Sequence, residues 1–150
     1  MTGIRKRHCF RRVPHQRYDA DSIGKRRSFC IFVYEENGTV LASAIINQSQ
    51  VYAYKEGDWQ YPAPTGQVMV LHTLTVSPAA GKRGIGISFV AFYENQAASR
   101  SCPYLRMDTN AINTRARALY KSLGYREIRI IPCTFNGIPD ITLILLEKKL

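Results

Sequence analysis

The sequence contains neither a long apolar run nor a close pair of cysteines. The longest apolar stretch near the C-terminus, Ile141 to Leu146, is interrupted by Thr142, whereas a membrane span needs about 20 apolar residues. The four cysteines stand far apart without CxxC spacing, so neither a zinc knuckle nor a redox motif is indicated. The apolar core of a signal peptide does not follow the basic N-terminus. We therefore expect a cytoplasmic protein that holds no metal and does not bind a membrane.

Acidic residues are scarce, and the positive charge is uneven. The chain has 21 Lys and Arg against 11 Asp and Glu, a net charge of +10. Residues 1–27 hold nine of the basic residues and two Asp, lack helical or strand periodicity, and are broken by Pro14 and Gly24. We predict that residues 1–27 are a basic arm or an altered N-terminal segment. Residues 28–150 are then one domain, long enough for a single core.

Alternating strand and helix patterns fill residues 28–150. Asn37-Gly38 between two β-rich runs predicts a hairpin. Apolar residues at helical spacing begin at Ile85 and again at Ala116, where Asn113 is a candidate N-cap and Gly124 a candidate C-terminal glycine. Strands are predicted at 28–34, 39–46, 67–76, 104–108, 125–131 and 141–147. The order β-β-β-α-β-α-β-β indicates an α/β (α+β) fold, with a mixed central sheet flanked by helices.

A glycine-rich turn links a predicted strand to a predicted helix. Glycine lets the backbone approach a ligand closely, and a helix N-terminus presents free N–H groups to an anion. The turn contains Gly81, Lys82, Arg83, Gly84 and Gly86. It lacks the Gly-Lys-Ser/Thr of a P-loop and the GxGxxG of a dinucleotide fold. The turn therefore favours a phosphate site of another kind, with a simple strand-to-helix connection as the alternative.

Two blocks of sequence resemble the GNAT superfamily of N-acetyltransferases. LTVSPAAGKRGIG resembles its pyrophosphate-binding motif, R/Q-x-x-G-x-G/A after a strand, and LRMDTNAINTRARALYKSLGY resembles its second block. The match covers roughly residues 28–150. It implies a GNAT-like acyl-CoA N-acyltransferase fold with a reduced or altered N-terminal region. It also implies acetyl transfer from acetyl-CoA to a primary amine of a small molecule or peptide, and it suggests a homodimer.

The resemblance implies roles for individual residues. The strand backbone at Leu74, Thr75 and Val76 would bind the pantetheine arm, and Tyr120 would protonate the departing thiolate. The bottom-up alternative for Tyr120 is a core aromatic residue. The pyrophosphate would lie at Gly81, Lys82, Arg83, Gly84, Ile85 and Gly86, and Asn113 would hydrogen-bond the cofactor arm. Gly81 stands where the family prefers Arg or Gln.

A lysine-like amine is neutral in only about one molecule in 2,500 at pH 7, so a base is needed. Many family members place a Glu on the strand that corresponds to 67–76, but this strand has no carboxylate, and His72 is its only titratable side chain. We predict His72 as the base, with Glu56 and Asp58 as alternatives. The acceptor is expected at an aromatic loop, at Tyr52, Tyr54, Glu56, Asp58 and Trp59.

Two other functions compete with acetyl transfer. The basic arm could contact nucleic acid, although aromatic residues for base stacking are scarce there, so nucleic acid is not expected as a partner. The nine basic residues are Arg5, Lys6, Arg7, Arg11, Arg12, Arg17, Lys25, Arg26 and Arg27. The second alternative is an acyl-CoA-binding fold that has lost catalysis, which Gly81 and the altered N-terminus favour.

Overall fold

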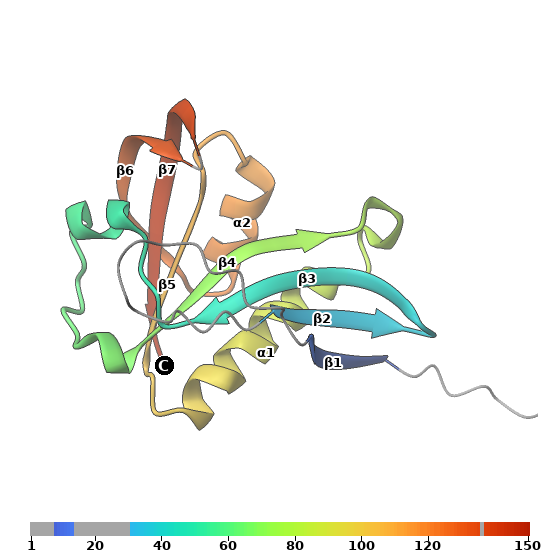
Figure 1. The fold of residues 1–150 in the computed structure, drawn as a ribbon. Helices are drawn as coiled ribbons and strands as arrows, with labels where there is room; N and C mark the ends of the chain where they lie inside the picture. Colours follow the sequence, from blue (N-terminus) through green and yellow to red (C-terminus); the bar gives the residue numbers. More distant parts are fainter. Residues whose placement is uncertain (1–7, 14–30, 136) are drawn as a thin grey trace, which may run out of the picture.

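A computed structural model of the chain describes residues 8–13, 31–135 and 137–150. These residues form one seven-stranded sheet with two α-helices (Figure 1). The strands are β1 (His8–Val13), β2 (Ile31–Glu36), β3 (Thr39–Asn47), β4 (Val68–Val76), β5 (Tyr104–Asn110), β6 (Arg126–Phe135) and β7 (Ile138–Lys149). Their order in the sheet is β1-β2-β3-β4-β5-β7-β6, and β4 and β5 are the parallel pair. The predicted mixed sheet with flanking helices is confirmed.

The hairpin between β2 and β3 has the predicted turn. Asn37 and Gly38 adopt left-handed backbone conformations, with φ of 51° and 81°. This conformation at both central residues is typical of the two-residue turns whose twist matches that of antiparallel strands. The hairpin is therefore specified locally by the Asn-Gly pair.

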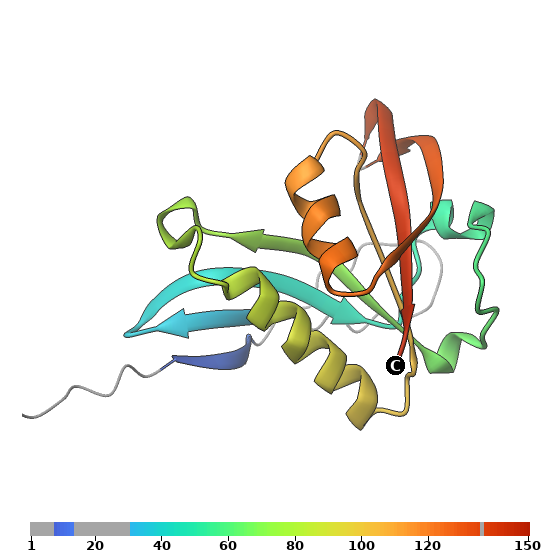
Figure 2. The same cartoon turned by 180° about the vertical axis from the view of Figure 1, so that it is seen from behind.

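Both helices, α1 (Ile85–Ser99) and α2 (Thr114–Ser122), lie on the same side of the sheet (Figure 2). Phe89 and Tyr93 of α1 are fully buried there, and the Tyr93 hydroxyl donates to the Met69 carbonyl at 2.7 Å. As predicted, Asn113 caps α2 by accepting from the Ala116 N–H at 3.1 Å, and Gly124 ends it with a φ of 87°. No helix in the described part of the chain is long and apolar enough to span a membrane.

The opposite face is covered by the segment between β3 and β4, which contains short 3-10 turns at Tyr52–Glu56 and Thr65–Gln67. Tyr54 is buried in a second apolar cluster with residues of β4, β6 and β7, and Trp59 packs against it. This loop therefore has a structural role in addition to its predicted role at the acceptor site.

Strands β4 and β5 pair over only half of their length. The parallel ladder joins Val68–Leu71 to Tyr104–Met107 and ends there. A bulge in β4 follows at once, because three residue steps from His72 to Thr75 oppose two steps on β3, and Thr73 has a φ of 53°. Beyond this point β4 continues beside β3 and β5 continues beside β7, so the two strands diverge (Figure 1).

Strand β1 was not predicted, and the expectation that residues 1–27 lack strand structure is wrong for residues 8–13. β1 pairs antiparallel with β2. Phe10 stacks on Phe92 of α1 with ring centroids 4.3 Å apart, and it contacts Phe89 edge-on at 5.2 Å. The sequence shows no clear strand pattern here, because Arg11 and Arg12 directly follow Phe10, the aromatic residue that packs on α1. Residues 1–7 and 14–30 lie outside the described residues, so the boundary near residue 27 stays a prediction.

We expect Phe10→Ala to lower the free energy of unfolding by about 2 kcal/mol, less than a fully buried phenylalanine because Phe10 is only partly buried. Arg12→Ala is the matched control, since Arg12 is exposed on the same strand and should change stability by less than about 0.5 kcal/mol. Urea denaturation measures both. Equal midpoints for the two variants would show that β1 contributes no packing energy.

Candidate active site

The glycine-rich turn forms the N-terminus of α1. Gly84 is the N-cap residue with a φ of 73°, and the first helical hydrogen bond runs from the Ser88 N–H to the Gly84 carbonyl at 3.0 Å. The N–H groups of residues 85–87 precede this bond, so they lack intrahelical acceptors. The first turn has no acidic residue, and a Cβ built on Gly84 would meet nothing within 4 Å. The turn thus presents backbone donors beside open space, as an anion site requires.

The two predicted cations of the turn differ in their partners. Arg83 donates to the Glu36 carboxylate at 2.5 Å, a hydrogen bond that raises the pKa of Arg83. Lys82 is exposed, and no ion pair of Lys82 occurs among the described residues. Arg83 is therefore held toward β2, which leaves Lys82 as the better placed cation for a phosphate.

The backbone predicted for the pantetheine arm lies where β4 has left β5. Leu74, Thr75 and Val76 follow the bulge, and the ladder to β5 has already ended at Leu71. Asn113 lies in the segment between β5 and α2, where its side-chain oxygen is used in the helix cap. Both predicted groups thus border the divergence between β4 and β5.

Tyr120 is 7% exposed and lies on α2 in the core cluster between the helices and the sheet. Its ring contacts Tyr125 edge-on at 6.1 Å. Burial, and next the charge of Asp108, raise the pKa of Tyr120 to about 12. Both effects favour the neutral hydroxyl of Tyr120, the form that can donate a proton.

Asp108 is a site residue that the sequence analysis missed. It is the first residue of β5 beyond the ladder with β4, and its Oδ2 accepts a hydrogen bond from the Tyr54 hydroxyl at 2.7 Å. Burial raises the pKa of Asp108, the hydrogen bond from Tyr54 lowers it, and His72 lowers it when its ring is charged. The signal was present in YLRMD, because charged residues alternate there with the buried Leu105 and Met107.

His72 occupies the equivalent place on β4, one residue beyond the ladder. Its Nε2 lies 3.0 Å from both Asn47 Oδ1 and the Ser49 carbonyl. Both of these atoms are acceptors, so Nε2 carries the hydrogen, and in the neutral ring Nδ1 has the lone pair. Burial lowers the pKa of His72. His72 is therefore neutral at pH 7 and, like Asp108, lies at the point where the strands separate.

Only part of the predicted acceptor loop lies where β4 and β5 separate. Tyr54 reaches Asp108, and Trp59 supports it by donating from Nε1 to the Tyr54 carbonyl at 2.8 Å. Tyr52 is 76% exposed, and Glu56 and Asp58 are also exposed, with Asp58 paired to Arg129 at 3.3 Å. The structure thus places Tyr54 at the site and leaves the two loop carboxylates at the surface.

Two buried charges anchor this loop to the sheet. Arg106 donates to Gln50 at 2.6 Å and to the Tyr61 carbonyl at 3.1 Å, and its guanidinium lies 4.0 Å from the centre of the Trp59 ring. Glu147, opposite Arg106 on β7, accepts from the Gln60 N–H at 2.7 Å. Such contacts at both sides of Trp59 restrict the loop and fix where Tyr54 enters the site.

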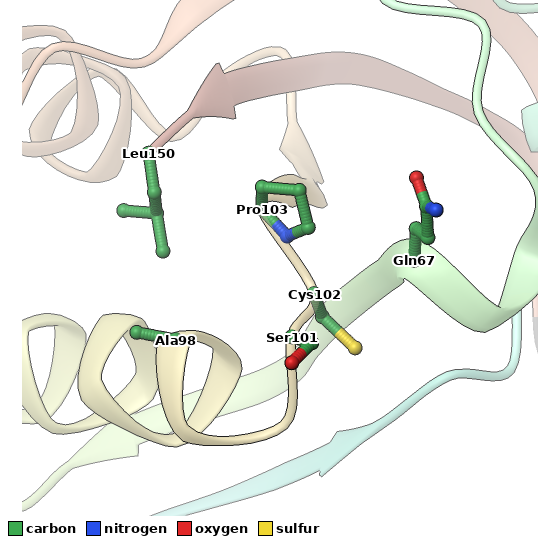
Figure 3. Close-up of a pocket in the computed structure, with 6 residues that line it drawn as sticks. All are labelled: Gln67, Ala98, Ser101, Cys102, Pro103 and Leu150. Carbon is green, nitrogen blue, oxygen red and sulfur yellow. The ribbon is translucent and has the colours of Figure 1, made fainter.

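A hollow of about 390 Å³ lies elsewhere, at the opposite end of α1 from the glycine-rich turn (Figure 3). None of the predicted site residues lines it. It is lined by Gln67, Ala98, Ser101, Cys102, Pro103 and Leu150. Within the described ranges, no group of three His, Cys, Asp or Glu residues could hold a metal ion.

Comparisons with known proteins agree with this geometry. The family model described as "Acetyltransferase (GNAT) family" matches residues 4–125. Among solved structures, the chain is similar to an IAA acetyltransferase from Bacillus cereus, with a TM-score of 0.70 and 18% identity over 96% of this chain and 100% of that chain.

Two further structures show the same fold. A ribosomal-protein-S18-alanine N-acetyltransferase from Escherichia coli has a TM-score of 0.60 and 21% identity, over 81% of this chain and 68% of that chain. A GNAT family acetyltransferase from Elizabethkingia anophelis with acetyl-CoA bound has a TM-score of 0.61 and 19% identity, over 82% and 77%. A comparison with curated protein sequences gave no match.

Proposed function

Because the chain belongs to the GNAT family of acetyltransferases, we propose that it transfers an acetyl group from acetyl-CoA to the primary amine of a small molecule or peptide. One feature of this structure supports the proposal independently of the family match. The divergence of β4 from β5 opens beside a helix N-terminus that offers unbonded N–H groups. A long ligand with a phosphate at one end and a reactive group at the other would match this arrangement.

The residues present fit acetyl-CoA. The N–H groups at the start of α1, together with Lys82, would hold the pyrophosphate, and the left-handed Gly84 allows close backbone approach. The backbone of Leu74–Val76 would bind the pantetheine arm, because its side toward β5 is not used by the sheet ladder. When bound, acetyl-CoA supplies the activated thioester.

The side chains at the split would carry out the proton transfers. Tyr120 approaches from the helix face and would protonate the thiolate. His72 and Asp108 are the titratable groups on the two strands where they separate, and Tyr54 holds Asp108 from the loop. The acceptor nitrogen would therefore enter from the loop face, where a group that can take its proton is already present.

The competing functions receive less support. Of the basic residues proposed to contact nucleic acid, only Arg11 and Arg12 lie within the described residues, and Arg11 is paired with Glu35 at 2.9 Å. Loss of catalysis is not favoured by a site that keeps Tyr120 and adds Asp108 and Tyr54. The homodimer suggested by the resemblance stays a prediction.

Two measurements test the proposed function. Calorimetry should detect acetyl-CoA binding to the purified protein. Release of the CoA thiol should then be followed with a panel of amines, for which we choose ethylamine, an aromatic ethylamine, a polyamine, free lysine and an alanine-terminated peptide. Thiol release above the rate of hydrolysis with at least one amine is expected. Binding without release for any amine would favour the inactive acyl-CoA-binding alternative.

A further inference from the structure

We propose that Asp108 is the group that takes the proton from the acceptor amine, and that Tyr54 is the residue that positions its carboxylate. This inference rests on the proposed acetyl transfer and assigns the carboxylate that β4 lacks to the neighbouring strand β5, in place of His72.

Asp108 lies directly beyond the end of the ladder between β4 and β5. It is the first residue of β5 whose neighbour on β4 has been lost, so its side chain borders the gap in which a ligand would lie. The alternation of β5 places Leu105 and Met107 in the helix-side core, and Asp108 points to the other face, where Tyr54 meets it. The acceptor nitrogen would enter from this loop face.

No lysine or arginine pairs with Asp108 among the described residues, because Arg106 on the same strand is engaged by Gln50 and the Tyr61 carbonyl. The charge of Asp108 raises the pKa of four titratable groups, each on a different element. These are Tyr54 of the loop, His72 of β4, Tyr120 of α2 and Cys133 of β6. No ion pair to Asp108 occurs among the described residues, and the Tyr54 hydroxyl donates a hydrogen bond to it. A half-buried carboxylate without a counter-ion is costly, and a substrate ammonium would supply that counter-ion.

Proton transfer from the ammonium to Asp108 makes the reaction feasible. The ammonium gives one proton to the carboxylate and becomes a neutral amine. Its nitrogen forms a bond to the acetyl carbon while the bond from that carbon to sulfur breaks, and the electron pair leaves with sulfur as a thiolate. The Tyr120 hydroxyl gives its proton to the thiolate and regains one from the acylated nitrogen. Asp108 then releases its proton to solvent, so the products are the N-acetyl amine, the CoA thiol and one proton.

The two proton transfers are coupled through charge. The negative charge of Asp108 raises the pKa of Tyr120. Once Asp108 has accepted a proton, that charge is gone, and Tyr120 becomes a stronger acid at the stage when the thiolate needs a proton. In this site the charge that acts on Tyr120 is that of Asp108, whereas the Nε2–H of His72 is held by Asn47 and Ser49.

The first test compares two acceptors of similar size. Ethylamine is cationic at pH 7, whereas 2,2,2-trifluoroethylamine is neutral and needs no base before it attacks. Asp108→Asn keeps an oxygen that can accept from Tyr54. We expect this variant to lose about 10²–10⁴ in kcat/KM with ethylamine and no more than about threefold with trifluoroethylamine.

His72→Asn is the matched control and should affect both amines alike. Loss confined to ethylamine in this variant would assign the base to His72 and overturn the proposal. Acetyl-CoA affinity, measured by calorimetry, should be unchanged in both variants and shows that the site is still folded.

Tyr54→Phe provides the second test, since it leaves the carboxylate in place. The base must be deprotonated, so kcat/KM rises with pH through the pKa of Asp108. Because the Tyr54 hydrogen bond lowers that pKa, its removal should move the acid limb of the profile to higher pH and leave the plateau above it nearly unchanged.

The outcomes separate this inference from the proposed function. An acid limb that does not move in Tyr54→Phe, or an Asp108→Asn variant that acetylates ethylamine at the wild-type rate, would overturn the role of Asp108 alone. A wild-type protein that binds acetyl-CoA but acetylates no amine would overturn the proposed function, and this inference with it.

Discussion

Replacing Gly84 with valine should weaken acetyl-CoA binding by about 100-fold. Gly84 has a φ of 73°, a conformation that a β-branched residue strongly disfavours. Valine would rotate the start of α1 and turn the N–H groups of residues 85–87 away from a pyrophosphate. The loss of two hydrogen bonds to a charged group costs about 3 kcal/mol or more, which corresponds to the expected factor.

Gly84→Asn is the control for this substitution. Asparagine tolerates left-handed conformations, and a Cβ at this position meets nothing within 4 Å, so most of the affinity should remain. Calorimetry with acetyl-CoA measures both variants, and circular dichroism confirms that they are folded. Wild-type affinity in a folded Gly84→Val protein would remove the pyrophosphate site from this turn.

Replacing Tyr120 with phenylalanine should lower kcat by about 10²–10⁴, the usual effect of removing a general acid. Acetyl-CoA affinity should barely change, because the interaction that is lost exists only in the transition state. The pKa of about 12 in the unliganded protein lies well above the value of about 8.5 for a free thiol, so the transfer is uphill by roughly 5 kcal/mol before Asp108 is neutralised. Burial is the larger cause of this high pKa and the charge of Asp108 the smaller one, so protonation of Asp108 removes part of this cost.

The alternative role of Tyr120 in packing gives a different result. Phenylalanine keeps the ring, so activity would survive and at most about 1 kcal/mol of stability would be lost. Tyr125→Phe is the matched control: Tyr125 is also buried, contacts the ring of Tyr120 and donates to Glu94 at 3.0 Å, but it has no assigned role in the reaction. Its kcat should equal that of the wild type. Steady-state kinetics and melting curves on both variants distinguish the roles.

Local signals predicted the parts of this protein that are specified by neighbouring residues. The Asn37-Gly38 turn, the Asn113 cap and the Gly84 turn each depend on the backbone preferences of one or two residues, and each lies where the sequence indicated. The family resemblance added the predicted roles of Tyr120 and of the β4 backbone, which periodicity alone does not indicate.

Contacts between distant segments could not be predicted in the same way. Arg83 was expected at a phosphate, but it is held by Glu36, a residue 47 positions earlier in the chain. Asp108 meets Tyr54 across 54 positions, and its importance depends on where the β4–β5 ladder ends. That end is set by the bulge at Thr73, and no local pattern in the sequence marks it.

The divergence of β4 and β5 also has a thermodynamic consequence. It leaves two strand edges facing each other inside the sheet, and unpaired edges are normally found only at a sheet's margins. A cofactor arm bound between these edges would hydrogen-bond to the strands only in the folded protein. It would therefore stabilise the folded state relative to the unfolded chain. At 100 times its dissociation constant, such a ligand adds about 2.7 kcal/mol to the free energy of unfolding. The supply of acetyl-CoA would then set the stability of the folded enzyme as well as its rate of turnover.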